Sequence, residues 1–309
     1  MGRVDSLSVV VPVYNSAQTL PELIRRLLAV VPASAESWEI VCVNDGSRDE
    51  SWTVLTRLAA AHAGIRGLDL MRNYGQHNAL LAGIRSARGA VTVTIDDDLQ
   101  HPPEAIPALL AALDGAHDVV YGTPRRPTHS PWRNLASWLT KMVLQGAMGV
   151  ETAKRVSAFR AFRTSLRAAF ADYRGPHLSI DVLLTWATTR FTAVPVDHTP
   201  RPAGASNYTV RTLMVHAMNM ITGFTTWPLR LASLVGFGAT AFGLLVLAYV
   251  VGRYVVEGGA PAGFPFLASI IAIFSGAQLF ALGMVGEYLS RMHFRMMERP
   301  AYVVRSERG

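Results

Sequence analysis

The chain has 309 residues, of which half are apolar, and a formal net charge of +7. This length allows one sizeable α/β domain with a smaller second part, and the apolar fraction is high for a purely soluble protein. The single cysteine, Cys42, lies in an apolar run, which excludes a disulfide framework and a thiolate metal site. The positive charge fits a protein that rests on anionic lipid and handles phosphorylated substrates, and it fits ordinary solubility equally well.

The first 121 residues alternate short β-branched runs with amphipathic segments, which is typical of a parallel sheet covered by helices. We expect strands over residues 7–11, 39–43, 65–70, 91–95 and 119–121. We expect helices over residues 19–30, 51–63, 77–87 and 103–113, the second capped by Ser51 and the fourth started by Pro102 and Pro103. The predicted fold class is α/β, with a mostly parallel sheet of the nucleotide-binding type.

Residues 122–205 are less regular, with a helix expected over 132–148 and a strand near 193–198, and we assign this half to acceptor binding. Apolar residues then recur at helical spacing from Val210 to Phe224, immediately before a long apolar stretch. The spacing alone is also typical of core packing, but its position favours an amphipathic juxtamembrane helix over 206–227.

Two stretches, 231–252 and 264–286, lack Asp, Glu and Lys and are long enough to cross a bilayer as helices. They predict a transmembrane hairpin over 228–290, with helices at about 229–252 and 264–289, followed by a basic cytoplasmic tail over 291–309.

Arginines place the expected ends of this hairpin on the cytoplasmic side. Arg230 precedes the first span, and Arg291, Arg295 and Arg299 follow the second, whereas Arg253 on the far side weakens the bias without reversing it. The short apolar run 7–11 is interrupted by Pro12 and has no cleavage site after it, so we expect no signal peptide. The prediction is a multi-pass protein of the inner (cytoplasmic) membrane, with residues 1–205 as a cytoplasmic domain.

Three acids, Asp96, Asp97 and Asp98, come directly after the expected strand 91–95. Ligands bind open α/β sheets at the carboxyl ends of their strands. Massed carboxylates are costly there unless a cation neutralises them, and hard oxygen ligands suit Mg²⁺ or Mn²⁺ bridging a diphosphate. The alternative is a solvated acidic turn that caps the next helix.

Polar residues also follow the first two strands, in Pro12-Val13-Tyr14-Asn15 and in Asn44-Asp45-Gly46-Ser47. A carboxylate such as Asp45 can accept a hydrogen bond from a base imide, and a ring such as that of Tyr14 can stack on the base. Each segment taken singly is equally typical of an ordinary turn.

These motifs, together with Arg72-Asn73-Tyr74-Gly75-Gln76-His77-Asn78 and Asp96-Asp97-Asp98-Leu99-Gln100, resemble those of family-2 glycosyltransferases of the GT-A fold. More narrowly, they resemble the polyprenyl-phosphate branch: dolichol-phosphate mannose synthases, bactoprenol glucosyltransferases and undecaprenyl-phosphate aminoarabinose transferases. The resemblance continues through the hairpin in Gly276-Ala277-Gln278 and Gly286-Glu287-Tyr288-Leu289, so it covers nearly the whole chain.

The resemblance implies roles for the residues of the donor side. Uridine would be held by Pro12, Tyr14, Asn15 and Asp45, and the donor pocket would also be lined by Asn73, Gln76, Asn78, Asp96 and Asp97. The metal would be bound by Asp96 and Asp98, with Asp98 as the direct ligand. Asn78 could equally serve the start of a helix.

The acceptor phosphate would be gripped by Arg125, Arg133, Ser137, Arg201, Ser206 and Tyr208, with Arg125 and Arg133 also in the catalytic set. Arginine suits this task because its planar fork binds phosphate oxygens in pairs, although a lone Arg is as often a solvated surface charge. Many relatives have Lys where this chain has Asn207, which puts that one phosphate contact in doubt.

The general base expected in bactoprenol glucosyltransferases is an Asp before Phe-Arg, and here that segment reads Ser157-Ala158-Phe159-Arg160. Either Asp181 has taken over this role, or the acceptor phosphate is already a dianion and needs no base. We favour a mixed account, in which Arg125, Arg133 and Arg201 orient the dianion and Asp181 at most positions the sugar or an arginine. The predicted catalytic set is therefore Asp98, Asp181, Arg125 and Arg133.

The implied function is inverting transfer of a sugar from a nucleotide diphosphate, UDP by resemblance, to undecaprenyl phosphate, for modification of a cell-envelope glycan. The expected partners are this donor, the lipid, the membrane and copies of the chain in a homotetramer, and not nucleic acid. A Rossmann dehydrogenase and a P-loop protein are excluded by the absence of their glycine motifs. The alternative of a different class is a non-catalytic membrane scaffold or carrier derived from a transferase, which would be expected to have lost acids from the 96–98 cluster.

Overall fold

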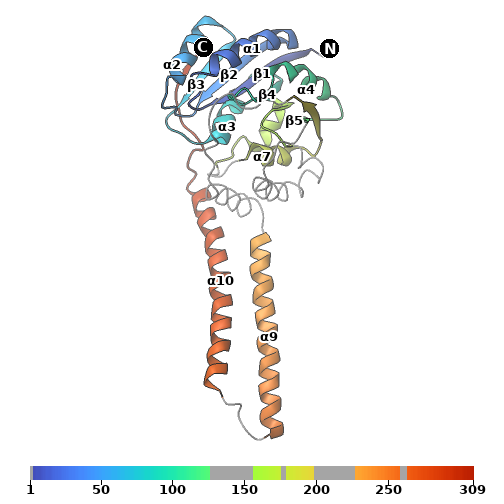
Figure 1. Cartoon of the computed structure of the whole chain (residues 1–309), viewed down its shortest axis with the longest axis vertical. Coiled ribbons are helices and arrows are strands. Elements are labelled where there is room, and N and C mark those ends of the chain that lie inside the picture. The colour runs from blue at the N-terminus through green and yellow to red at the C-terminus, as the bar shows by residue number, and fades with distance from the viewer. Residues whose placement is uncertain (1–2, 126–155, 175–178, 198–226, 258–262) are drawn as a thin grey trace. The chain divides into compact units, whose positions relative to one another are not determined.

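The computed structural model describes residues 3–125, 156–174, 179–197, 227–257 and 263–309. The chain divides into two compact units, one made of Met1–Thr209 with Glu298–Gly309 and the other of Val210–Met297. The first unit is an α/β domain, and the second contains two long helices (Figure 1).

The described part of the first unit contains one eight-stranded sheet in the order β7-β5-β6-β4-β1-β2-β3-β8. Its strands are β1 (Val4–Val13), β2 (Ala35–Asn44), β3 (Ile65–Leu70), β4 (Val91–Thr94), β5 (Val119–Pro124), β6 (Arg160–Arg163), β7 (Phe191–Val196) and β8 (Val304–Arg308). The pairs β1–β2, β1–β4, β2–β3 and β5–β7 are parallel, whereas β6 and β8 run antiparallel to their neighbours. The predicted mostly parallel sheet is therefore confirmed.

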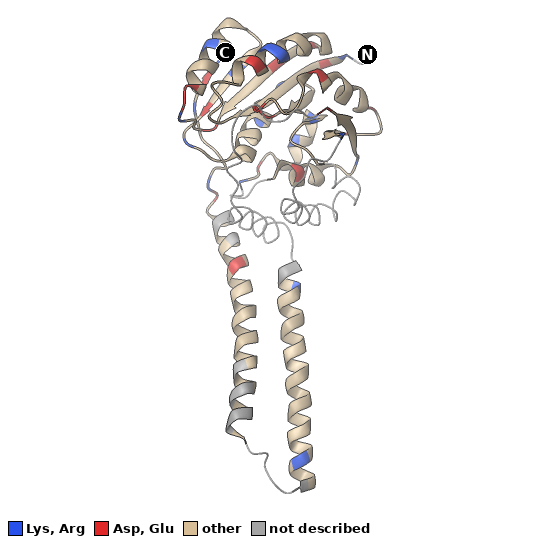
Figure 2. Cartoon of the chain, viewed as in Figure 1, with Lys and Arg blue, Asp and Glu red and all other residues tan. Residues whose placement is uncertain are grey.

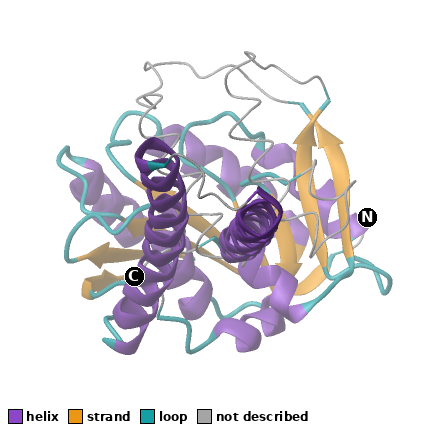
Figure 3. Ribbon diagram, turned by 90° about the horizontal axis from the view of Figure 1, so that it is seen from below, coloured by secondary structure: helices purple, strands orange, loops and turns teal. Residues whose placement is uncertain are grey.

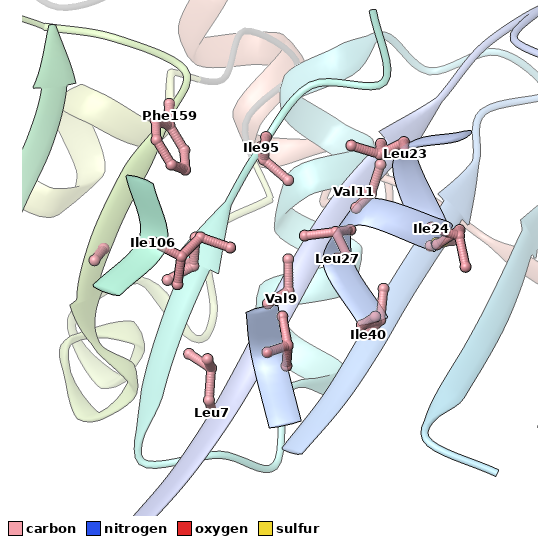
Figure 4. Packing of buried hydrophobic residues seen from close by; sticks show 14 of the residues in the cluster. Leu7, Val9, Val11, Leu23, Ile24, Leu27, Ile40, Ile95, Ile106 and Phe159 are labelled. Atoms are coloured by element: carbon pink, nitrogen blue, oxygen red, sulfur yellow. The ribbon is translucent and has the colours of Figure 1, made fainter. Parts of the chain in front are cut away.

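Helices cover both faces of this sheet (Figure 3). They are α1 (Leu20–Ser34), α2 (Ser51–Ala61), α3 (Gln76–Ser86), α4 (Ile106–Ala112) and α7 (Ile180–Ala187), with short 3-10 turns η1 (Pro103–Ala105) and η2 (Thr164–Phe170). On one face, the alternate β1 residues Leu7, Val9 and Val11 pack with Leu23 and Leu27 of α1 (Figure 4). On the other face, Val10 meets α3, where a Cβ on Gly83 would lie 2.3 Å from the Val10 side chain.

Burial on both faces explains why the central strand reads as a continuous apolar run rather than an alternating one. The side chains of Val9, Val10 and Val11 are all fully buried. Cys42 of β2 is also buried, and burial, with a smaller contribution from the Asp97 charge, raises the pKa of its thiol to about 12, as expected for a core residue.

Local details differ from the sequence prediction. β1 and β2 extend beyond 7–11 and 39–43, and the helix expected over 103–113 is divided into η1 and α4. Ser51 is the first residue of α2 rather than its cap, and its hydroxyl donates to Asp49 Oδ1 at 2.5 Å. The strand expected near 193–198 is β7, and the helix expected over 132–148 lies outside the described residues. The juxtamembrane helix expected over 206–227 also lies outside them, except for Trp227, which begins a longer helix.

The prediction of a basic tail over 291–309 is wrong for its last residues. Glu298–Gly309 belongs to the first unit, and β8 pairs with β3. The segment carries Arg299, Arg305 and Arg308, so its composition resembled a solvated tail. Its pairing with a strand more than two hundred residues earlier leaves no local signal.

The second unit contains α9 (Trp227–Glu257) and α10 (Phe264–Met296). Few charged residues lie along the described parts of these helices (Figure 2). α9 and α10 approach closely at Gly243, where a Cβ would lie 2.1 Å from the ring of Phe274. Within the described residues, one segment, Leu229–Val256, is long and apolar enough to cross a membrane. A hairpin with two spans stays a prediction.

Candidate active site

Segments that follow β1, β2, β3 and β4 meet at one edge of the sheet, because these four strands are parallel. Asn15 joins the first two segments: its backbone N–H donates to Ser47 Oγ at 3.0 Å, and its Oδ1 accepts from Arg48 N at 2.8 Å. Asn15 has φ 54°, a left-handed conformation that Asn tolerates better than most residues. The segments after β1 and β2 are therefore in direct contact.

Asp97, the middle acid of the cluster, connects the β4 segment to the β1 segment. Its Oδ2 accepts from Tyr14 N at 3.1 Å and from the hydroxyl of Ser16 in a short hydrogen bond. Burial raises the pKa of Asp97, and these two donors oppose that rise. Asp97 thus fixes the backbone beneath Tyr14, whose exposed ring is the one predicted to stack on the base.

Asp45 performs a similar task between β2 and the loop after β3. Its Oδ1 accepts from Tyr74 N at 2.7 Å, and its Oδ2 accepts from Gly75 N at 2.8 Å. The residue is 2% exposed, and burial raises its pKa although both N–H groups favour the ionised form. Gly46 has φ +64°, and a Cβ there would lie 2.6 Å from Asn73 N, so the turn and the loop are in direct backbone contact.

Asp96 lies at the carboxyl end of β4, where its Oδ1 accepts from Gln76 Nε2 at 2.6 Å. Burial, followed by the charges of Asp98 and Asp97, raises the pKa of Asp96 to about 7. A buried carboxylate beside two other acids is a setting in which a cation is favoured.

Asp98 is oriented by its own turn, in which Oδ1 accepts from Gln100 N at 3.1 Å. The turn places Leu99 at φ 60°, a conformation that is costly for a branched side chain, while that side chain packs against the core. Strain of this kind is found where the surrounding structure holds a functional group in place.

A divalent cation fits these residues as a two-carboxylate site. No group of three or more His, Cys, Asp or Glu side chains among the described residues forms a metal cage. Mg²⁺ is often bound through one or two carboxylates and the phosphates of its substrate, so Asp96 and Asp98 suffice. Asp97 accepts from the β1 segment through Tyr14 and Ser16, whereas Asp96 and Asp98, the predicted ligand pair, accept from Gln76 and Gln100.

A buried polar network lies next to this acid cluster. Arg160 of β6, 1% exposed, donates from Nε to Thr94 Oγ1 at 3.1 Å and from Nη1 to Asp181 Oδ1 in a short ion pair. Tyr121 OH donates to the same carboxylate oxygen at 3.0 Å, and burial raises the pKa of this phenol well above its usual value. The Arg160 charge also lowers the pKa of Asp96, against the larger effect of burial.

The residues of this network were missed by sequence reasoning, apart from Asp181. Arg160 was noted only as part of the segment that lacks an acid before Phe159. The sequence signal for a buried polar network was the pair Thr92 and Thr94 within an otherwise apolar strand, since buried hydroxyls need hydrogen-bond partners.

Comparisons with known proteins decide the family. The model of the family described as "Glycosyl transferase family 2" matches residues 8–173 of this chain. This chain belongs to glycosyltransferase family 2. An undecaprenyl-phosphate 4-deoxy-4-formamido-L-arabinose transferase of Shewanella sediminis is 36% identical over 98% of this chain and 92% of the relative. Its counterpart in Pseudomonas paraeruginosa is 37% identical over 97% of this chain and 90% of the relative.

Among solved structures, the mannosyl-3-phosphoglycerate synthase of Rubrobacter xylanophilus has a TM-score of 0.52 and 20% identity, covering 73% of this family-2 chain and 74% of the synthase. At this identity the likeness shows the fold alone, which is the predicted GT-A α/β fold.

The other predicted site residues of this glycosyltransferase are distributed as follows. Pro12 lies within β1, Asn73 lies in the loop held by Asp45, and Asn78 is in the first turn of α3, where its Nδ2 donates to Tyr74 O at 2.7 Å. Arg125 follows β5 and forms an exposed ion pair with Asp197 at 3.3 Å. The remaining predicted phosphate contacts lie outside the described residues: Arg133, Ser137, Arg201, Ser206 and Tyr208.

Proposed function

We propose that this chain transfers a sugar from a UDP-sugar to undecaprenyl phosphate, with inversion at the anomeric carbon. The observation that carries the proposal is the near-full-length identity of about 36% to relatives named as undecaprenyl-phosphate 4-deoxy-4-formamido-L-arabinose transferases. Their names also supply the first candidate for the sugar, 4-deoxy-4-formamido-L-arabinose. The site supports a glycosyltransferase because all three acids of the cluster are present and firmly oriented.

On the donor side, Tyr14, Asn15, Asp45 and the loop after β3 would form the nucleoside pocket. Asp97 and Asp45 support it indirectly, since each accepts backbone hydrogen bonds that hold a pocket segment in place. Asp96 and Asp98 would hold Mg²⁺ or Mn²⁺. A bound divalent cation stabilises the charge that builds on a departing diphosphate.

On the acceptor side, we propose that no general base is required. A phosphate monoester has its second pKa at about 6, so at neutral pH the acceptor is mostly a dianion and has no proton to lose on attack. Asp181 is engaged by Arg160 and Tyr121, which favours a role as a buried counter-ion. Arg125, with Arg133 and Arg201, would orient the phosphate through charge-assisted hydrogen bonds.

We further propose that α9 and α10 anchor the enzyme in the inner membrane as a hairpin, with the GT-A domain in the cytoplasm and the assembly a tetramer. The apolar segment Leu229–Val256 supports the first span. Reporter fusions in the 255–263 loop test the topology, because a loop that stayed cytoplasmic would exclude the hairpin. Mass determination of the detergent-solubilised protein tests the tetramer.

The decisive experiment offers the purified full chain a panel of UDP-, GDP- and dTDP-sugars with undecaprenyl phosphate. UDP-linked 4-deoxy-4-formamido-L-arabinose is included in the panel. We expect one UDP-sugar to give a lipid-phosphate-linked monosaccharide of inverted anomeric configuration, as assigned by NMR of the product. The matched control is Asp98→Ala, which keeps the domain but removes a proposed metal ligand. Transfer to no acceptor from any donor would overturn the proposal and favour the scaffold alternative.

A further inference from the structure

The residues that follow α10 return to the edge of the sheet and lie beside β3. β8 pairs antiparallel with β3, with Leu68 opposite Glu307 and Asp69 opposite Ser306. The far end of β8 is fixed by an ion pair in which Glu307 Oε1 accepts from Arg66 Nη2 at 2.6 Å and from Arg66 Nε at 3.1 Å. Arg66 is 7% exposed and also donates to Glu39 at 2.6 Å, so this end of the strand is attached to the centre of the domain.

At the other end of β8 the register shifts between Asp69 and Leu70, since Ser306 is opposite Asp69 whereas Val304 is opposite Leu70. Arg305 is the extra residue of this irregularity. Bulges of this kind redirect a side chain and are frequent beside active sites.

The redirected side chain of Arg305 reaches the end of β3. Its Nη2 donates to Met71 O at 2.8 Å, and its Nη1 lies 3.5 Å from Asp69 Oδ2. The backbone N–H of Met71 in turn donates to Val303 O at 2.9 Å. Both backbone polar groups of Met71 are therefore held by residues 303–305.

Met71 is the residue that leads into the donor loop, defined here as residues 72–75. The other end of this loop is held by Asp45 through Tyr74 N and Gly75 N. Asp69 also accepts from Asn44 Nδ2 at 2.7 Å, and Asn44 directly precedes Asp45. Arg305 thus contacts Met71, the residue before the donor loop. Through Asp69 and Asn44 it is also connected to the end of β2, where Asp45 holds the other end of the loop.

We propose that Arg305 is a positioning residue for the nucleotide-binding loop, so that the segment after α10 sets affinity for the donor. This inference rests on the proposed function, which assigns residues 72–75 to the donor pocket. Without the guanidinium, Met71 keeps its bond to Val303, but its carbonyl and Asp69 lose their cationic partner. The donor loop then opens more often, and the donor pays the cost of ordering it on binding.

The test compares Arg305→Ala with Arg308→Ala in the full-length protein in detergent. Arg308 is an exposed arginine at the end of the same strand, so its removal matches the change in charge and location. The first measurement is amide hydrogen exchange of peptides that cover residues 71–76. We expect about fivefold faster exchange in Arg305→Ala, because the variant loses one exposed, charged hydrogen bond. We expect no change in Arg308→Ala.

The second measurement is steady-state kinetics with both substrates. In Arg305→Ala the KM for the nucleotide sugar is expected to rise about fivefold, with kcat and the KM for the lipid phosphate nearly unchanged. Arg305→Lys keeps a cation near Asp69 and is expected to restore part of the donor affinity. If Arg305→Ala fails to fold, Arg305→Lys is measured in its place, with a smaller expected effect of the same sign.

Unchanged exchange at residues 71–76, or an equal change in Arg308→Ala, would overturn the proposal, as would equal rises in both KM values. The two arms separate this inference from the proposed function. If the wild type transfers no sugar, the proposed function fails, whereas the exchange measurement still decides whether Arg305 holds the loop.

Discussion

Replacing Asp181 by Asn tests whether this carboxylate is a buried counter-ion or a general base. Asp181 is 8% exposed and forms an ion pair with Arg160, which is 1% exposed. Removing one partner of a buried ion pair costs about 3–5 kcal/mol because the other charge is left uncompensated. Asn keeps an oxygen that can accept from Arg160 or Tyr121, so we expect a loss of about 2–3 kcal/mol.

For a domain of this size, that loss corresponds to a fall in Tm of about 5–10 °C. Thermal unfolding in detergent measures it. Turnover, assayed well below the transition, is expected to fall by less than about tenfold, because Asp181 transfers no proton in the proposed mechanism. The acid limb of the pH profile should still follow the second ionisation of the acceptor phosphate, at about pH 6.

Two further variants make this interpretation sharp. Asp172→Asn removes an exposed carboxylate from the same region and is expected to leave both Tm and rate unchanged. Tyr121→Phe removes one donor to Asp181 and should cost about 1 kcal/mol. A loss of turnover of about 10²-fold or more in Asp181→Asn, with Tm preserved and the acid limb displaced, would show a general base and refute the reasoning.

Three other predictions concern the metal, the donor loop and the sheet. Asp98→Ala, or excess EDTA with wild type, should reduce transfer by at least about 10²-fold, and full activity in EDTA would exclude the metal. Asp45→Asn should raise the donor KM about tenfold, because an amide has one acceptor oxygen for the two N–H groups of Tyr74 and Gly75; an unchanged KM would contradict this role. For Glu39, burial raises the pKa, but hydrogen bonds from Ser8, Arg66 and Arg88 N outweigh burial, so the net pKa is lowered. The ionised carboxylate therefore stabilises the fold above the unfolded-state pKa of about 4.3, and this stabilisation is lost as the pH falls through the folded-state pKa. The Tm of Glu39→Gln should therefore lie below that of wild type at pH 7 and approach it below about pH 4, whereas a difference independent of pH would contradict the assignment.

Sequence spacing was enough to predict the parts of this protein that depend on near neighbours. The apolar runs of β1, β2 and β4 and the helices between them required a parallel sheet, and a parallel sheet brings the ends of those strands together. The acids at 96–98 were therefore expected beside the ends of the neighbouring strands, and their hydrogen bonds with Tyr14 and Gln76 place them there. The motifs that resemble family-2 glycosyltransferases lie in these same segments, which is why fold and family were predicted together.

The contacts that those acids make with distant segments were decided only by the tertiary structure. Asp96, Asp97 and Asp98 are adjacent in sequence, yet Asp97 is engaged by Tyr14 and Ser16, over eighty residues away along the chain. The same holds for the ion pair between Arg160 and Asp181 and for the contact of Arg305 with Met71. A side chain's role depends on which groups contact it once the chain is folded. Periodicity reports which face of an element is buried, but not which partner from a distant element satisfies its buried charge.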